Sequence, residues 1–361
     1  MTDVLSLRAL NRATLARQLL LERSELPLLD AVGHLVGLQA QEPPDPYLGL
    51  WSRVADFRPE ELSRLLLDRR VVRIAVMRST LHLVTADDCL VLRPLMQPVL
   101  DAELARHREY APALAGVDVD AVLAFGREFL AEPRTGRELR AALAERFPEH
   151  EPAALAYACR NHLGVVQVPP RGVWGRTGGV VTTTAESWLG RPFATSPSLD
   201  DVVARYLGAF GPATVADVAA WSRLTGLGEV VERLRPKLRT FRDERGRELF
   251  DLPGAPRPGP DVPAPVRFLP EYDNLLLSHA DRSRFAAPGR RELLGRVTGR
   301  INGTVLVDGT VSAVWQLEPG RLVVSHVPMT KRAAASVEAE GRRFLRFRAT
   351  DVREVKLVAI S

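Results

Sequence analysis

The amino-acid sequence predicts an α+β fold in which three tandem winged-helix units are followed by a β-rich C-terminal part. Apolar residues recur at helical spacing and are followed by short runs rich in β-branched residues, and this order appears three times. The last quarter instead alternates apolar and polar residues between glycine-containing turns. Three helices followed by a hairpin is the element order of a winged helix, a domain that most often binds duplex DNA.

The first unit is predicted in residues 1–115. Leucines recur at helical spacing opposite arginines in 7–23, which indicates an amphipathic helix. A second helix is expected over about 27–38, and the prolines of "QEPPDP" should forbid its continuation. A third helix over 59–67 opens on a proline, and the run "VVRIAVMRSTLHLVT" then predicts a hairpin.

The same order returns in residues 116–197 and 198–252, the predicted second and third winged-helix units. Thr135 and Glu138 are spaced as a capping box at one helix start. A turn near 244–246 separates the two strands of the third unit. The repetition concerns the order of elements and not the letters. The helices of these two units are predicted at about 118–131, 135–147, 151–162, 200–211, 214–226 and 228–238.

Residues 253–361 are predicted to form a proline-rich linker and a β-rich C-terminal part. Six prolines in 253–266 favour an extended linker. Apolar and polar residues alternate beyond it, and a helix over about 332–348 and the strand "VREVKLVAI" close the chain. Turns are expected at Asn302-Gly303, Asp308-Gly309 and Pro319-Gly320.

The composition, 46% hydrophobic and 26% charged over 361 residues, is typical of a globular protein. No apolar run approaches the roughly 20 residues of a membrane helix, and the N-terminus lacks a signal-peptide pattern, so the cytoplasm is the expected compartment. The protein is further expected to be a monomer and, as a DNA-binding protein, to be associated with the nucleoid. The excess positive charge lies in residues 267–361, with 16 Lys or Arg against 10 Asp or Glu. Charge alone leaves open a nucleic-acid partner or a solvated basic surface.

The sequence supports no metal site and no cofactor. Cys89 and Cys159 are 70 positions apart in predicted helices, so neither a zinc cluster nor a disulfide framework is expected. The seven histidines fall in different elements without a pair at i, i+4. A glycine-rich phosphate loop and a Gly-x-Ser-x-Gly elbow are both missing. Metal-free chemistry or pure binding therefore remains.

Gln39 and Gln41, two of six glutamines, stand close together in "VGLQAQEPPDPYLGLWSR". In an extended backbone their side chains would point the same way. An amide offers an acceptor and two donors but no useful basicity, so the pair could assist only a reaction whose leaving group is already activated. Spacing alone favours the alternative that both amides satisfy backbone groups in a turn.

A second candidate cluster lies in "FLPEYDNLLLSHADRSRF", which holds Glu271, Asp273, His279, Asp281 and Arg282. It could be an acid-base cluster, although ion pairs and loop hydrogen bonds explain such a cluster more often. A hydrolase of other small substrates built around Asp273 and His279 is one interpretation.

Four stretches resemble the AlkZ-like winged-helix DNA glycosylases over essentially the whole chain. They are "ALNRATLARQLLLER" with "VGLQAQEPPDPYLGLWSR", "MRSTLHLVTADD", "GPATVADVAAWSRL", and "FLPEYDNLLLSHADRSR" with "INGTVLVDGTVSAVW". The resemblance implies three winged helices and a β-rich part in a C-shaped body with a basic concave face for double-stranded DNA.

The resemblance also implies a catalytic motif, glutamine-apolar-glutamine, which Gln39, Ala40 and Gln41 match. This all-amide branch is associated with unhooking azinomycin-type interstrand crosslinks at N7 of guanine. The expected enzyme is a monofunctional DNA glycosylase of base excision repair. It would excise cationic N7- or N3-alkylated purines, since glycosidic cleavage there needs a positioned water and favourable dipoles more than a strong base. None of the three lysines lies near the pair, so an intact abasic site is expected.

Family-marking stretches supply further candidates for contact with DNA or the lesion, each of which could equally be structural. The resemblance implies a C-terminal hairpin, "RLVVSHVPMT", that reaches the lesion. His326 is the candidate for that contact, with Pro328 shaping the tip, and the alternative is a surface histidine at a strand end. The alternative function is a non-catalytic winged-helix DNA-binding regulator. Self-resistance and general repair both stay open. The candidates are Arg78, Thr80, His82, Asp273, Arg282, His326 and Pro328.

Overall fold

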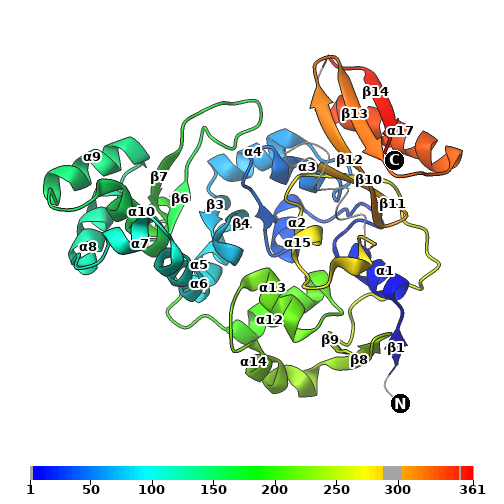
Figure 1. The fold of residues 1–361 in the computed structure, drawn as a ribbon, viewed down its shortest axis with the longest axis horizontal. Helices are drawn as coiled ribbons and strands as arrows, with labels where there is room; N and C mark the ends of the chain where they lie inside the picture. The colour runs from blue at the N-terminus through cyan, green and yellow to red at the C-terminus, as the bar shows by residue number, and fades with distance from the viewer. Residues whose placement is uncertain (1–2, 288–302, 349–350, 361) are drawn as a thin grey trace.

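The computed structural model describes residues 3–287, 303–348 and 351–360. Helices and three sheets are mixed along the chain, which confirms the predicted α+β class. The molecule is elongated, with the helices of the second unit at one end and the C-terminal sheet at the other (Figure 1). Among the described residues, no helix is long and apolar enough to span a membrane.

The N-terminal part departs from the prediction around the glutamine motif. Helix α2 ends at His34, before the prolines, because Val36 (φ 54°) and Gly37 (φ 87°) turn the chain into the left-handed region. The prolines instead open a helix that was not predicted, with Pro46 in its first turn. The expectation that the prolines end α2 was therefore wrong. The elements are β1 (Val4–Leu5), α1 (Leu7–Arg17), α2 (Leu28–His34), β2 (Leu38–Gln39), α3 (Asp45–Trp51), α4 (Pro59–Leu67), β3 (Val71–Ala75), η1 (Met77–Ser79), β4 (Leu81–Thr85), α5 (Ala86–Leu95), α6 (Gln97–Arg106) and α7 (Tyr110–Ala113).

The next two regions each contain three helices followed by an antiparallel hairpin, as predicted. The Thr135–Glu138 capping box is present. Their assignment as winged-helix units, and the unit boundaries, stay predictions. The elements are α8 (Val119–Phe129), β5 (Arg134–Thr135), α9 (Gly136–Arg146), α10 (Pro152–His162), β6 (Val165–Gln167), β7 (Val181–Thr184), α11 (Ala185–Leu189), α12 (Leu199–Phe210), α13 (Val215–Ser222), α14 (Leu227–Leu234), η2 (Arg235–Lys237), β8 (Arg239–Asp243) and β9 (Glu248–Asp251).

One six-stranded sheet joins the first two regions, in the order β2-β4-β3-β6-β7-β5. Its junction is the antiparallel pair β3 and β6, where Ile74 lies opposite Val166. Strand β2 is an edge strand of this sheet, and Gln39 lies opposite His82 of β4. The glutamine motif therefore belongs to the same sheet as "MRSTLHLV".

The N-terminal strand and helix bind the third region. Strand β1 runs parallel to β8, with Val4 opposite Arg242. From α1, the buried Arg17 donates two hydrogen bonds of 2.6 and 2.9 Å to the carboxylate of Asp251. A planar guanidinium that meets a carboxylate in this way holds the two elements in one orientation.

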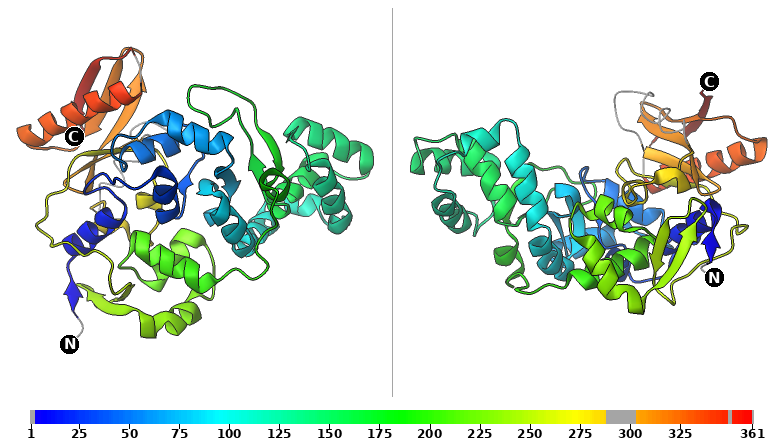
Figure 2. Two further views of the ribbon diagram at one scale, coloured as in Figure 1. Left: turned by 180° about the vertical axis from the view of Figure 1, so that it is seen from behind. Right: turned by 60° about the horizontal axis from the view of Figure 1, so that its bottom comes forward.

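The C-terminal part is a five-stranded sheet in the order β10-β11-β12-β13-β14. Helix α17 lies along one face of it, as the view from behind shows (Figure 2). Strand β10 runs into the loop that reaches the glutamine strand. The expected turns at 308–309 and 319–320 are present, whereas Asn302 lies outside the described residues. The elements are β10 (Arg267–Leu269), α15 (Asn274–Leu277), η3 (Arg282–Arg284), β11 (Gly303–Val307), β12 (Thr310–Glu318), β13 (Arg321–His326), α17 (Lys331–Phe347) and β14 (Glu354–Ala359).

Candidate active site

The backbone of Gln39 is held from two sides. Strand β4 binds it on one side, where the amide of Ala40 donates to the carbonyl of Leu81 at 2.8 Å. On the other side, the side chain of Asn274 accepts a hydrogen bond from the backbone N–H of Gln39 at 3.2 Å and donates one to the backbone carbonyl of Gly37 at 2.6 Å. Asn274 lies 235 residues from Gln39 in the sequence, so only the folded chain completes this arrangement.

The side chain of Gln39, 6% exposed, is oriented by Arg78. Nη2 of Arg78 lies 2.6 Å from Oε1 of Gln39. A guanidinium can only donate, so the atom that faces it must be the amide oxygen, and the amide nitrogen is turned away. Gln39 therefore keeps its NH₂ group as a donor for a ligand.

His82 holds the guanidinium of Arg78 in place through a hydrogen bond. Its Nδ1 lies 2.8 Å from the carbonyl oxygen of Thr80, which can only accept, so Nδ1 carries the hydrogen. Its Nε2 then accepts from Nη2 of Arg78 at 3.3 Å. Burial, and then the charge of Arg78, lowers the pKa of His82 to about 3. The imidazole is thus neutral at physiological pH and acts as an acceptor, not as a proton shuttle.

The turn that carries Arg78 is strained. Arg78 (φ 59°) and Ser79 (φ 56°) both adopt left-handed backbone conformations, which cost on the order of 1 kcal/mol each for residues other than glycine. This turn directs the guanidinium toward Gln39 and toward the carbonyl of Trp221, to which it donates at 3.0 Å. Burial, followed by the charges of Arg223 and Arg282, lowers the pKa of Arg78 to about 10. The guanidinium stays charged and is well suited to an anionic partner.

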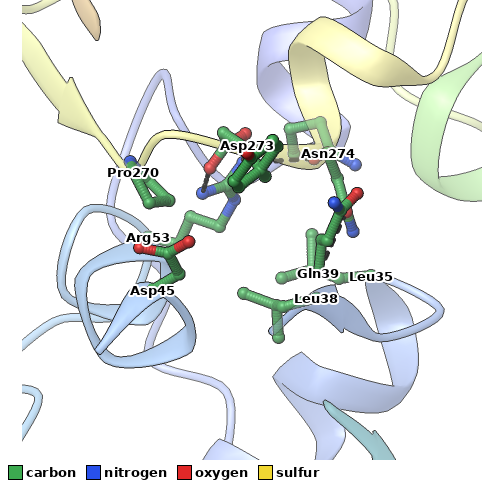
Figure 3. A pocket seen from close by; sticks show the side chains of 10 residues that line it. Leu35, Leu38, Gln39, Asp45, Arg53, Pro270, Asp273 and Asn274 are labelled. Atoms are coloured by element: carbon green, nitrogen blue, oxygen red, sulfur yellow. Dashed lines mark hydrogen bonds and ion pairs between the residues drawn. The ribbon is translucent and has the colours of Figure 1, made fainter. Parts of the chain in front are cut away.

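Gln39 lines a small cavity between β2, α3 and the loop after β10 (Figure 3). One wall is the buried ion pair of Arg53 and Asp273, which is joined by two hydrogen bonds of 2.8 and 2.7 Å. Asp273 also caps α15 by accepting from the amide of Leu275 at 2.9 Å. The other residues around the cavity are Gln18, Leu35, Leu38, Asp45, Pro270, Tyr272 and Asn274.

Gln41 and Thr80 lie nearby but differ from Gln39 in their surroundings. Gln41 is exposed in the bend between β2 and α3. It is not one of the described residues that line the cavity. Thr80 is half-buried, and its hydroxyl donates to the carbonyl of Met77 at 3.1 Å. The structure thus places one amide of the motif in the cavity and the other at the surface.

An open groove of about 1200 Å³ begins at Arg78 and Ser79. Three arginines that the sequence analysis did not single out line it: Arg106 at the end of α6, Arg108 just beyond that helix, and Arg223 at the end of α13. Arg282 of η3 lies near enough to Arg78 to depress its pKa. Glu103 and Glu109 also line the groove, but with Arg78 its four arginines outnumber these two carboxylates, a balance that favours contact with a phosphate backbone. No sequence signal pointed to these arginines, because the basic excess of the chain lies in residues 267–361.

His326 and Pro328 are placed differently from the expectation. The tip of the β12–β13 hairpin is the Pro319-Gly320 turn, and His326 ends β13 at the opposite end of that hairpin. The exposed Pro328 lies in the connection to α17, so the idea that it shapes a hairpin tip was wrong. Nδ1 of His326 lies 2.8 Å from the carbonyl oxygen of Val327, and contact of His326 with DNA stays a prediction.

The other acidic and basic candidates of the Glu271–Arg282 stretch do not form one site. Asp273 binds Arg53. His279 is buried elsewhere, and its Nε2 lies 3.1 Å from the carbonyl oxygen of Phe210. Asp281 forms ion pairs with Arg245 and Arg247. In the part of the chain that is described, no group of three or more His, Cys, Asp or Glu side chains is arranged to hold a metal ion.

A family model described as DNA glycosylase AlkZ-like matches residues 32–347, a range that contains the glutamine motif, Arg78 and the Arg53–Asp273 pair. The chain belongs to this family. It is therefore a DNA glycosylase, as its four marker stretches predict, and not a non-catalytic regulator.

The chain is also similar to a relative and to a solved structure, both from Streptomyces sahachiroi. The chain is 27% identical to an interstrand DNA cross-link repair glycosylase over 91% of its own length and 93% of the relative. The solved structure of a DNA glycosylase AlkZ superposes with a TM-score of 0.81 at 24% identity, covering 99% of this chain and all of the other. At this identity the structural likeness concerns the fold.

Proposed function

We propose that this glycosylase releases cationic N7- or N3-alkylated purines from duplex DNA, including bulky N7-alkylguanine adducts and interstrand crosslinks. The observation that carries the proposal is the Gln39 amide, which Arg78 holds at 2.6 Å beside a small cavity. The 27% identical relative, an interstrand DNA cross-link repair glycosylase, supports the substrate class.

The chemistry of the amide suits a purine that is already charged. Alkylation at N7 or N3 makes the purine a good leaving group, so the bond to the sugar breaks with little help from acid or base. The enzyme then needs a water in the correct place and dipoles that favour the sugar cation. Gln39 would hold that water through its NH₂ group, and Gln41, at the surface, would contact the lesion or its sugar.

The expected product is an intact abasic site. Strand-nicking glycosylases use an amine to form a Schiff base. The three lysines lie in η2, at the start of α17 and in β14, and none lines the cavity in the described structure: Lys237, Lys331 and Lys356. Strand cleavage without base or heat, or a borohydride-trapped adduct, would contradict this product.

The test measures base release from duplexes that carry N7-methylguanine, a bulky N7 adduct or a native crosslink. Gln39→Ala and Gln41→Ala should each lower the single-turnover rate by about 10²-fold, the loss typical for one positioned donor, while duplex affinity stays within about 2-fold. Gln316→Ala, in the C-terminal sheet, is the matched control. Equal release of uracil or of a neutral mismatched base would defeat the proposal.

A further inference from the structure

Asp45, the first residue of α3, lines the same cavity as Gln39. Figure 3 shows the two side chains on opposite sides of it, with Leu38 between them. Oδ2 of Asp45 is shielded from solvent and has no hydrogen-bond partner among the described residues. A shielded carboxylate oxygen without a partner is destabilising, so it is a candidate for a functional group.

The acidic neighbours of Asp45 disfavour its charge. Glu42 precedes it in the same turn, and Glu271 and Asp273 face it from the loop after β10. Burial contributes most, followed by these three carboxylates, and together they raise the pKa of Asp45 to about 7. Burial, followed by the hydrogen bond and charge of Glu271, raises the pKa of Tyr272 on the same loop to about 12, and the charge of Asp45 adds to this shift.

Among the described residues, no hydrogen bond or ion pair joins a nearby cation to Oδ2 of Asp45. Arg53 uses two nitrogens on Asp273, and Arg73 of β3 donates to a backbone carbonyl of the glutamine motif at 2.8 Å. Arg348, at the end of α17, is the cation that opposes the shift of this carboxyl. The carboxyl thus stays without a fixed counter-charge and keeps a high affinity for a proton.

The cavity has room for a single small ligand. The space open to a water-sized sphere is about 10 Å³, close to the minimum that holds one water molecule. Because Gln39 and Asp45 both line the cavity, a water in it would meet a donor in the NH₂ group of Gln39 and an acceptor in the carboxylate of Asp45.

We propose that Asp45 is a catalytic residue, the base that accepts a proton from a water held between it and the Gln39 amide; this rests on the proposed function. As the bond from C1′ to N9 breaks, its electron pair leaves with the cationic purine, which becomes neutral. The water oxygen bonds to C1′, and its proton passes to the Asp45 carboxylate. The glutamines lack the basicity for this step, and Asp45 supplies it.

The first test is Asp45→Asn, which preserves shape and removes the base. The single-turnover rate of base release from an N7-methylguanine duplex should fall by about 10²-fold, while duplex affinity changes less than about 2-fold. The wild-type rate should decline as the pH falls below about 7, because protonation removes the base, and this decline should be absent in the variant. Asp45→Glu should restore part of the rate.

A second variant separates the base from a structural role. Glu42→Gln removes a neighbouring negative charge, so the midpoint of the acid decline should move to lower pH with little change in the maximal rate. Glu61→Gln, at an exposed position of α4, should leave the midpoint of the acid decline unchanged.

The outcomes distinguish the two proposals. If wild-type protein releases base but Asp45→Asn matches it in rate and pH profile, the role of Asp45 is overturned and the function stands. If wild-type protein releases base from none of the duplexes, both fail. A loss of rate in Asp45→Asn with an unchanged acid decline also counts against the base, because the titrating group is then another residue.

Discussion

Asp45 and Asp273 are carboxylates that line one cavity in opposite circumstances. Asp273 accepts two hydrogen bonds from Arg53 and caps α15, so its charge is compensated and it joins the turn after α3 to the loop after β10. Asp45 has an oxygen without a partner among the described residues, and its pKa is raised to about 7. A compensated carboxylate stabilises the fold, whereas an uncompensated one keeps a proton affinity that chemistry can use.

The largest expected effect comes from breaking the compensated member. Asp273→Ala leaves Arg53 buried without a counter-charge and should lower the free energy of unfolding by about 3–5 kcal/mol in urea denaturation. The control is Asp87→Ala, which removes an exposed ion pair with Arg191 and should cost less than about 1 kcal/mol. Similar costs for both variants would show that Asp273 is no structural anchor.

A second prediction concerns the residue that orients Gln39. Arg78→Lys keeps the charge but cannot bond the amide oxygen, Trp221 and His82 together. The single-turnover rate should fall by about 10- to 100-fold, because a displaced catalytic group loses its alignment. Arg64→Lys, on the exposed surface of α4, serves as the control. A rate that is unchanged while duplex affinity falls would make Arg78 a phosphate contact only.

The smallest effect sharpens the assignment of Asp45. Its folded pKa of about 7 lies above the ordinary value of 3.8, so the folded state binds more protons between these pH values, and stability falls as the pH rises from about 4 to 7. Asp45→Asn removes this loss. The melting temperature of the variant relative to wild type should therefore be higher at pH 8 than at pH 5, by about 2 °C or more. The same difference at both pH values would mean that Asp45 has an ordinary pKa.

Elements with local signals were predicted closely. Pro59 marks the start of α4, and the capping box of Thr135 and Glu138 marks the start of α9. Both signals act within one helical turn, so neighbouring residues suffice to define them. By contrast, the end of α2 depends on the positive φ angles of Val36 and Gly37, and the side chain of Val84 and the carbonyl of Leu83 pack against Gly37. These contacts come from β4 and cannot be inferred from the helix itself.

The residues of the candidate site also fall into two groups, those that the sequence predicted and one, Asp45, that only the folded structure reveals. The glutamine pair stood out because two amides fall beside a proline-rich turn, and the family motif gave them a role. Asp45 did not stand out, since an acidic residue in the first turn of a helix is common. Its distinguishing feature is the carboxylates that approach it from a loop more than 220 residues away, such as Glu271.

The sequence by itself determined the α+β class, the order of helices and hairpins in the second and third regions, and the family, because hydrophobic period, caps and turns are local properties. The tertiary structure alone decided that β3 pairs with β6, that Arg78 orients Gln39, and that Asp45 lacks the counter-charge that Asp273 has. Pairing of distant strands and the pKa of a buried group depend on which segments meet in space, and the local pattern of residues does not encode that choice.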